Sequence, residues 1–130
     1  MTRRIINAIV LVVLGALTGT IGTVAHQAAL GIGSARIPTG LVLALVAVAL
    51  LVVGARLVTQ DRWAAVWLAV GVVGMIAVFS KRSPGGSVLI PNDLAGQIWV
   101  FGPAVISAIA IAWPRVTRRR GAAGAAGPSA

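Results

Sequence analysis

The sequence predicts an all-α fold: an integral membrane bundle of four transmembrane helices. Of its 130 residues, 58% are hydrophobic and only 10% are charged, and a water-soluble domain of this size needs a larger charged surface. The apolar residues also gather into four blocks, each near the roughly 17–25 residues of helix that cross a bilayer. Because the blocks are apolar on all sides and do not alternate with polar residues, they indicate helices and not membrane-spanning strands.

The four predicted spans cover about residues 5–25, 38–55, 63–79 and 98–113. They form one transmembrane domain, residues 1–114. Residues 115–130 are basic and then low in complexity, which predicts a disordered cytoplasmic tail. The first block follows Arg3-Arg4 as a signal peptide would, but no convincing cleavage site leads to a polar mature domain. A retained first helix is therefore expected.

The basic residues predict the orientation of the bundle. With four spans, both termini and the turn at residues 56–62 lie on one side, which carries Arg3, Arg4, Arg56, Arg62, Arg115, Arg118, Arg119 and Arg120. Residues 26–37 and 80–97 lie on the other side, which carries Arg36, Lys81 and Arg82. The more basic side, with both termini, is expected in the cytoplasm. Almost all basic residues are Arg, and Ala, Val and Gly are abundant, which favours a GC-rich bacterium and its plasma membrane.

Several function classes are disfavoured by what the chain lacks. It has no cysteine, which excludes disulfides, thiolate catalysis and Cys-ligated metals within the chain. The net charge is +9, and the basic residues that produce it flank the apolar blocks. Membrane lipids and not nucleic acids are therefore the expected partners. No charged residue lies inside a predicted span, which disfavours ion-coupled transport. Asp61 and Asp93, the only acids, are expected on opposite sides of the membrane. We therefore expect no enzyme, no cofactor and no metal.

Small residues on two spans are candidates for helix contacts. Gly15, Gly19 and Thr23 follow one another at four-residue spacing, and the third span carries Gly71 and Gly74. Such faces let helices approach closely in lipid. They indicate either packing among the helices of this chain, which is the commoner case, or contact with a larger membrane protein or a second copy.

His26, at the outer end of the first span, is the only histidine. A bis-histidine haem within one chain is therefore excluded, and no carboxylate lies nearby in sequence to complete a metal site. A polar residue at the membrane interface is the default interpretation. A role shared with a partner subunit stays open as the alternative.

The connection at residues 80–97 combines several local signals. Residues 83–86, Ser-Pro-Gly-Gly, predict a tight turn. Asp93 is expected to cap the last helix, where an acid also favours the positive end of the helix dipole. The remaining apolar residues predict an outer contact surface, for a partner or for the membrane interface: Val88, Leu89, Ile90 and Trp99.

Residues 83–102, SPGGSVLIPNDLAGQIWVFG, join a Pro-Gly-Gly turn, an aliphatic run ending at Pro91 and a Gly–aromatic entry into the last helix. In this stretch the chain resembles a family of small actinobacterial membrane proteins of unknown function. Elsewhere the likeness is one of hydropathy. The resemblance implies a four-helix membrane domain and transfers no catalytic residue.

Three functions follow from these observations. The leading expectation is a non-enzymatic accessory or scaffold subunit that docks to a partner through the glycine-bearing helices and the outer loop. The alternative is a small homodimeric transporter or channel, whose pathway would be lined by the hydroxyls of Thr18, Thr20, Thr23 and Ser107. A lipid-modifying enzyme would require His26 and Asp93 to converge in one pocket.

Overall fold

The computed structural model describes residues 1–81, 86 and 90–114 of the chain. Its elements are α1 (Thr2–Ala25), β1 (Leu30–Ile32), β2 (Ala35–Ile37), α2 (Thr39–Thr59), α3 (Arg62–Phe79) and α4 (Leu94–Ala112). All four helices are long and apolar enough to cross a membrane, which confirms that part of the predicted fold. The expected turn around residues 83–85, Val88, Leu89 and the tail 115–130 lie outside the described residues.

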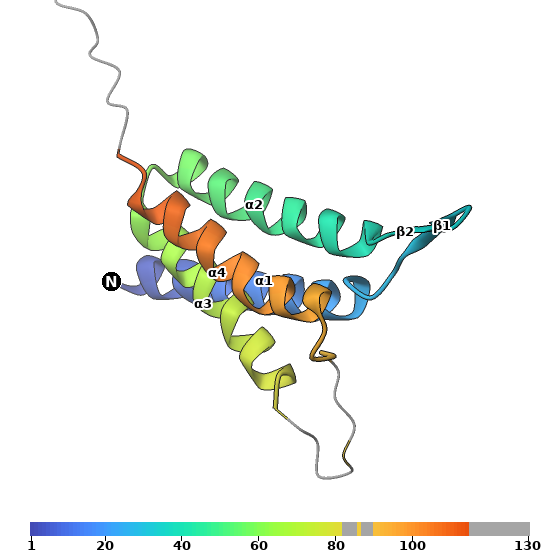
Figure 1. The fold of residues 1–130 in the computed structure, drawn as a ribbon. Coiled ribbons are helices and arrows are strands. Elements are labelled where there is room, and N and C mark those ends of the chain that lie inside the picture. The colour runs from blue at the N-terminus through green and yellow to red at the C-terminus, as the bar shows by residue number, and fades with distance from the viewer. Residues whose placement is uncertain (82–85, 87–89, 115–130) are drawn as a thin grey trace, which may run out of the picture.

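The two ends of the bundle differ in what they carry. The N-terminus and the end of α4 lie at one end, and the hairpin β1–β2 and the start of α4 lie at the other (Figure 1). The longest interface joins α1 and α3, while α2 lies against α3 and α4. Fully buried aliphatic side chains of α2 and α3 form the core between the helices: Val48, Val52, Leu68 and Val72.

Acidic caps set the starts of α3 and α4. The backbone N–H of Trp63 donates to Oδ1 of Asp61 over 3.1 Å, and the N–H of Gly96 donates to Oδ1 of Asp93 over 2.7 Å. Each bond satisfies one of the donors that a helix start leaves unpaired. The cap at Asp93 explains why α4 begins ahead of the apolar block that starts near residue 98.

The end of α2 lies beyond residue 55, where its apolar block stops. Arg56 belongs to the last turn of the helix, where a cation is favoured by the helix dipole. One of its guanidinium nitrogens donates to the backbone oxygen of Trp113, just after α4. This contact joins the ends of α2 and α4 and satisfies a carbonyl that a helix end leaves without a partner.

A hairpin occupies most of the connection between α1 and α2, for which the sequence predicted a side of the membrane but no secondary structure. Its antiparallel register pairs Leu30 with Ile37, Gly31 with Arg36 and Ile32 with Ala35. Gly33 has φ 63°, a conformation that favours glycine and suits the first central position of a two-residue hairpin turn. The turn consists of Gly33 and Ser34.

The glycines of α1 and α3 bring these two helices together. A Cβ atom on Gly15 would overlap the backbone oxygen of Leu68, and one on Gly71 would overlap the backbone oxygen of Val12. A Cβ on Gly19 would lie 2.7 Å from the oxygen of Val72. These glycines therefore act in packing within the chain, the first of the two expected interpretations.

Gly74 does not share this role, although it was grouped with Gly71 as a candidate contact. It is exposed, and a Cβ there would meet no atom within 4 Å. The reason is the helical period: Gly71, Val72 and Met75 form the side of α3 that faces α1, and Gly74 lies off that side.

Candidate functional site: a pocket at the hairpin end

A pocket of about 470 Å³ lies where α1 ends and where α2 and α4 begin. Its polar lining comes from three separate segments: His26 and Gln27 after α1, Arg36 on β2, and Asp93 before α4. Its apolar lining includes Pro38, Leu41, Leu94 and Ile98. The fold thus brings together His26 and Asp93, which the sequence could only place on the same side of the membrane.

Backbone hydrogen bonds fix the segment that carries His26. The N–H of His26 donates to the oxygen of Gly22 over 2.8 Å, and the N–H of Ala28 donates to the oxygen of Ala25 over 2.9 Å. The N–H of Gly40, in the first turn of α2, then donates to the oxygen of Ala28 over 2.9 Å. These bonds hold the end of α1 against the start of α2, so backbone hydrogen bonds fix this wall of the pocket.

His26 is only 2% exposed, so the protein itself covers this residue at the end of α1. Its Nδ1 lies 2.6 Å from the backbone oxygen of Thr23. Because that oxygen can only accept, we assign the proton to Nδ1, which makes Nε2 of the neutral ring a hydrogen-bond acceptor. Nε2 is buried and has no hydrogen-bond partner among the residues described.

Trp99 stacks on His26, with ring centroids 5.8 Å apart and an interplanar angle of 9°. Its Nε1 donates to Oγ1 of Thr23 over 3.1 Å, and that hydroxyl donates to the oxygen of Gly19 over 2.7 Å. A Cβ on Gly22 would overlap the indole ring. The small face of α1 therefore contacts two neighbours: α3 along its middle, and Trp99 of α4 near its C-terminal end.

These contacts correct the expected outer contact surface. Trp99 is completely buried and Ile90 is only 6% exposed, so both belong to the core of the chain and not to an accessible outer loop. The reason for Trp99 is steric and polar together: Gly22 leaves space for the ring, and Thr23 supplies an acceptor for its N–H. No sequence signal pairs these residues, since they come from different helices.

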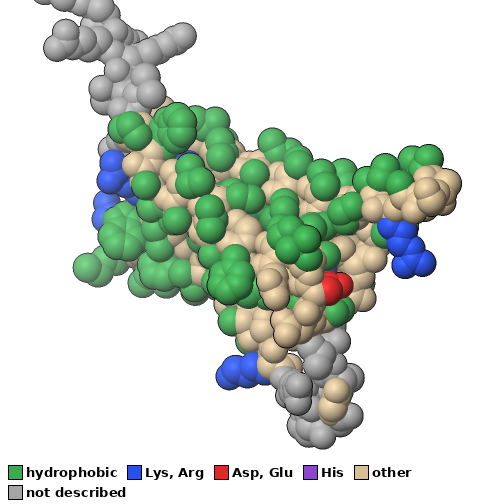
Figure 2. Space-filling model, in the orientation of Figure 1, with side chains coloured by type: hydrophobic (Ala, Val, Ile, Leu, Met, Phe, Trp, Pro, Cys, Tyr) green, Lys and Arg blue, Asp and Glu red, His purple; other side chains and the backbone are tan. Residues whose placement is uncertain are grey.

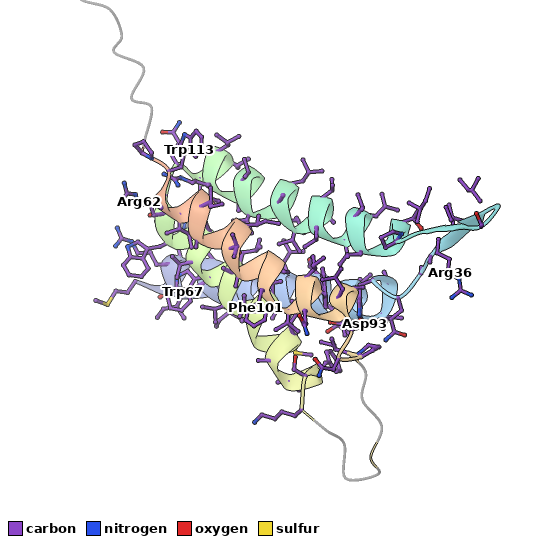
Figure 3. The ribbon with its side chains drawn as sticks, viewed as in Figure 1. Arg36, Arg62, Trp67, Asp93, Phe101 and Trp113 are labelled. Carbon is purple, nitrogen blue, oxygen red and sulfur yellow. The ribbon has the colours of Figure 1, made fainter. Side chains whose placement is uncertain are left out.

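Arg36 and Asp93 give the pocket its two opposite charges. Figure 3 shows both at the hairpin end, with the Arg36 side chain directed from the hairpin toward the side on which Asp93 lies. No ion pair joins them in the described part of the chain. One oxygen of Asp93 is occupied by the cap of α4, and no described residue donates to its second oxygen.

The hydroxyl groups expected along a transport pathway lie elsewhere. Thr18 and Thr20 donate to oxygens of their own helix, those of Leu14 and Ala16, over 2.8 Å each. Ser107 is buried in α4, and its Oγ has no partner among the described residues. None of these residues lines the pocket at His26 or a second pocket of about 420 Å³ beside Asn92 and Gln97.

The pocket offers an imidazole and a carboxylate, the pair that a lipid-modifying enzyme would need. Its described lining contains no Ser, Thr, Lys or Tyr that could act as a nucleophile beside them. No group of three or more His, Cys, Asp or Glu side chains that could hold a metal ion occurs among the described residues. The arrangement is suited to binding a ligand that carries polar and apolar parts.

No protein-family model matches the chain, and no curated protein or solved structure is significantly similar to it. The resemblance of residues 83–102 to small actinobacterial membrane proteins therefore stays an expectation from the sequence. Function has to be inferred from the hairpin and the pocket themselves.

Proposed function

We propose that the chain is a multi-pass protein of the bacterial plasma membrane and acts as a non-enzymatic accessory subunit. Both termini lie in the cytoplasm, and the hairpin end faces outward. The subunit docks to a larger membrane protein through the hairpin β1–β2. The observation that carries this proposal is the apolar face of the hairpin.

The register divides the hairpin into two unlike faces. Cross-strand partners point to the same side of a ribbon, and so do residues two apart along a strand. One face therefore carries Leu30, Ile32, Ala35 and Ile37, and the opposite face carries Gly31 and Arg36. The apolar face is uncovered: Leu30 is 59% and Ile32 is 65% exposed. Figure 2 shows hydrophobic side chains over one side of the hairpin, with a basic side chain on the other.

The position of the hairpin explains why this face needs a partner. The strands extend past the ends of the helices (Figure 1). In a bilayer that these helices span, the hairpin would therefore lie beyond the layer of lipid tails. A two-stranded hairpin is marginally stable by itself and leaves its outer backbone groups unpaired. An aliphatic face at such a place favours a protein contact.

Docking through the hairpin also agrees with how the glycines are used. Gly15, Gly19 and Gly71 are occupied by contacts within the chain, so they offer no free face to a partner. We therefore assign docking to the hairpin at the outer end of the molecule and not to the glycine-bearing helices.

Site-specific crosslinking tests the proposal, because the chain contains no cysteine and each introduced thiol is unique. A thiol-reactive photocrosslinker is attached to each introduced cysteine. Ile32→Cys places it on the apolar face, and Gly31→Cys places it on the opposite face of the same strand. In native membranes we expect one protein adduct of discrete mass from Ile32→Cys and much less of it from Gly31→Cys.

A mid-membrane variant completes the crosslinking experiment. Val46→Cys lies on an exposed part of α2, where lipid contact is expected. If Ile32→Cys yields only lipid adducts, or if Val46→Cys yields the same protein adduct with equal efficiency, docking through the hairpin is excluded.

A further inference from the structure

We propose that the pocket at His26 binds the headgroup of a phospholipid that carries both a phosphate and a primary amine, the phosphatidylethanolamine class. The lipid belongs to the leaflet at the hairpin end. This site is separate from the apolar face of the hairpin, because Arg36 and the aliphatic residues lie on opposite faces of the same ribbon. Lipid binding and partner docking can therefore be tested independently.

The first argument is charge complementarity. Arg36 and Asp93 line one pocket but form no ion pair with each other in the part of the chain that is described. A zwitterionic headgroup supplies a counter-charge to both at once. The guanidinium matches two oxygens of a phosphate, and the oxygen of Asp93 not used in the α4 cap can accept from an ammonium group.

The second argument is the unsatisfied acceptor on His26. Nε2 is a buried acceptor for which the described residues provide no donor, and such a group lowers stability while it has no partner. His26 lines the same pocket as Asp93. A primary ammonium carries three N–H donors, so it can serve the imidazole and the carboxylate together.

The third argument is the place and shape of the pocket. Its apolar wall includes Leu94 and Ile98 of α4, which are 74% and 40% exposed and so continue onto the lipid-facing side of the helix. Acyl chains can follow this surface while the headgroup occupies the pocket. A volume of about 470 Å³ falls within the range of roughly 300–1,000 Å³ typical of small-molecule sites.

The same features distinguish this headgroup from two common alternatives. Phosphatidylglycerol carries the same phosphate but no cation, so Asp93 gains no counter-charge while the phosphate of the net anionic headgroup lies nearby. A choline headgroup carries a positive charge but no N–H, so neither Nε2 of His26 nor the carboxylate of Asp93 gains a donor. Both lipids should therefore bind more weakly.

Native mass spectrometry of the full-length detergent-purified chain tests this inference with three lipids of identical acyl chains: phosphatidylethanolamine, phosphatidylglycerol and phosphatidylcholine. We expect the ethanolamine lipid to bind about tenfold more tightly than the other two, because only its headgroup can donate a charge-assisted hydrogen bond to Asp93. Asp93→Asn should remove this preference, because asparagine caps a helix as well as aspartate but carries no charge. Arg36→Gln should weaken the binding of all three lipids, because each carries a phosphate.

Matched controls exist at the other end of the bundle. Asp61→Asn removes the charge of the equivalent cap on α3, and Arg62→Gln removes a neighbouring cation. Both should leave lipid binding unchanged. The inference is overturned if the wild-type chain binds the three lipids equally, if it prefers phosphatidylglycerol, or if Asp93→Asn binds as Asp61→Asn does. None of these results would alter the crosslinks from Ile32→Cys.

Discussion

At the scale of single residues, the polar groups of Thr23, His26 and Trp99 form one buried cluster at the hairpin end of the bundle. The Thr23 hydroxyl donates to Gly19 and accepts from Trp99, and the Thr23 carbonyl lies against Nδ1 of His26. In an apolar surrounding each of these groups needs a partner, because a buried polar group without one is costly. The cluster therefore fixes how α1 and α4 meet.

Thr23→Val tests this cluster while keeping the shape of the side chain. It leaves the buried N–H of Trp99 without an acceptor, so we expect it to destabilise the chain by roughly 1–3 kcal/mol. The matched control is Thr18→Val, since the Thr18 hydroxyl bonds only to an oxygen of its own helix and its loss should cost less than about 0.5 kcal/mol. Thermal unfolding in detergent measures both. Equal losses in the two variants would show that the Trp99–Thr23 bond contributes nothing.

Residue-level features show where prediction from sequence succeeds and where it fails. The Asp93 cap could be expected, because a cap depends on residues adjacent in the chain. The burial of Trp99 could not, since an aromatic residue near the start of a span also suits the membrane interface. Its actual place depends on Gly22 and Thr23 of another helix. The pocket depends likewise on three segments that only the fold brings together.

At the scale of elements, the helices follow from apolar runs, whereas the hairpin was missed. Its signal is present: Leu30, Ile32, Ala35 and Ile37 flank Gly33-Ser34 in an alternating pattern with a two-residue turn. Each strand is only three residues long, so the pattern is short beside the apolar blocks around it. The contact between α1 and α3 was more accessible to prediction, because Gly15, Gly19 and Gly71 mark a close approach.

Two alanine substitutions on α3 test that contact, because they are expected to change the stability of the chain in opposite directions. Gly71→Ala introduces a methyl group against the backbone of α1, and overpacking of this kind destabilises by roughly 1–3 kcal/mol. Gly74→Ala adds a methyl group to open space and should stabilise by up to about 1 kcal/mol through helix propensity. Thermal unfolding of both variants provides the comparison. A shift of the same sign and size in each would refute the assigned α1–α3 interface.

At the scale of the whole molecule, the two ends of the bundle are chemically unlike. Arg3, Arg4, Arg56 and Arg62 lie toward the end that carries the N-terminus and the end of α4, and Figure 3 shows Arg62 and Trp113 there. The opposite end carries the hairpin with Arg36, the pocket and the capping Asp93. The distribution of basic residues predicts which end stays inside the cell, and the docking proposal requires the hairpin end to be outside.

The measurement that tests this orientation of the bundle most directly is labelling of single cysteines in intact cells with a membrane-impermeant maleimide. Ser34→Cys places the thiol in the turn of the hairpin, and Thr2→Cys places it at the start of α1; both positions are exposed. The account predicts that Ser34→Cys is labelled in intact cells and that Thr2→Cys is labelled only after the membrane is permeabilised. The reverse pattern, or labelling of both variants in intact cells, would contradict it.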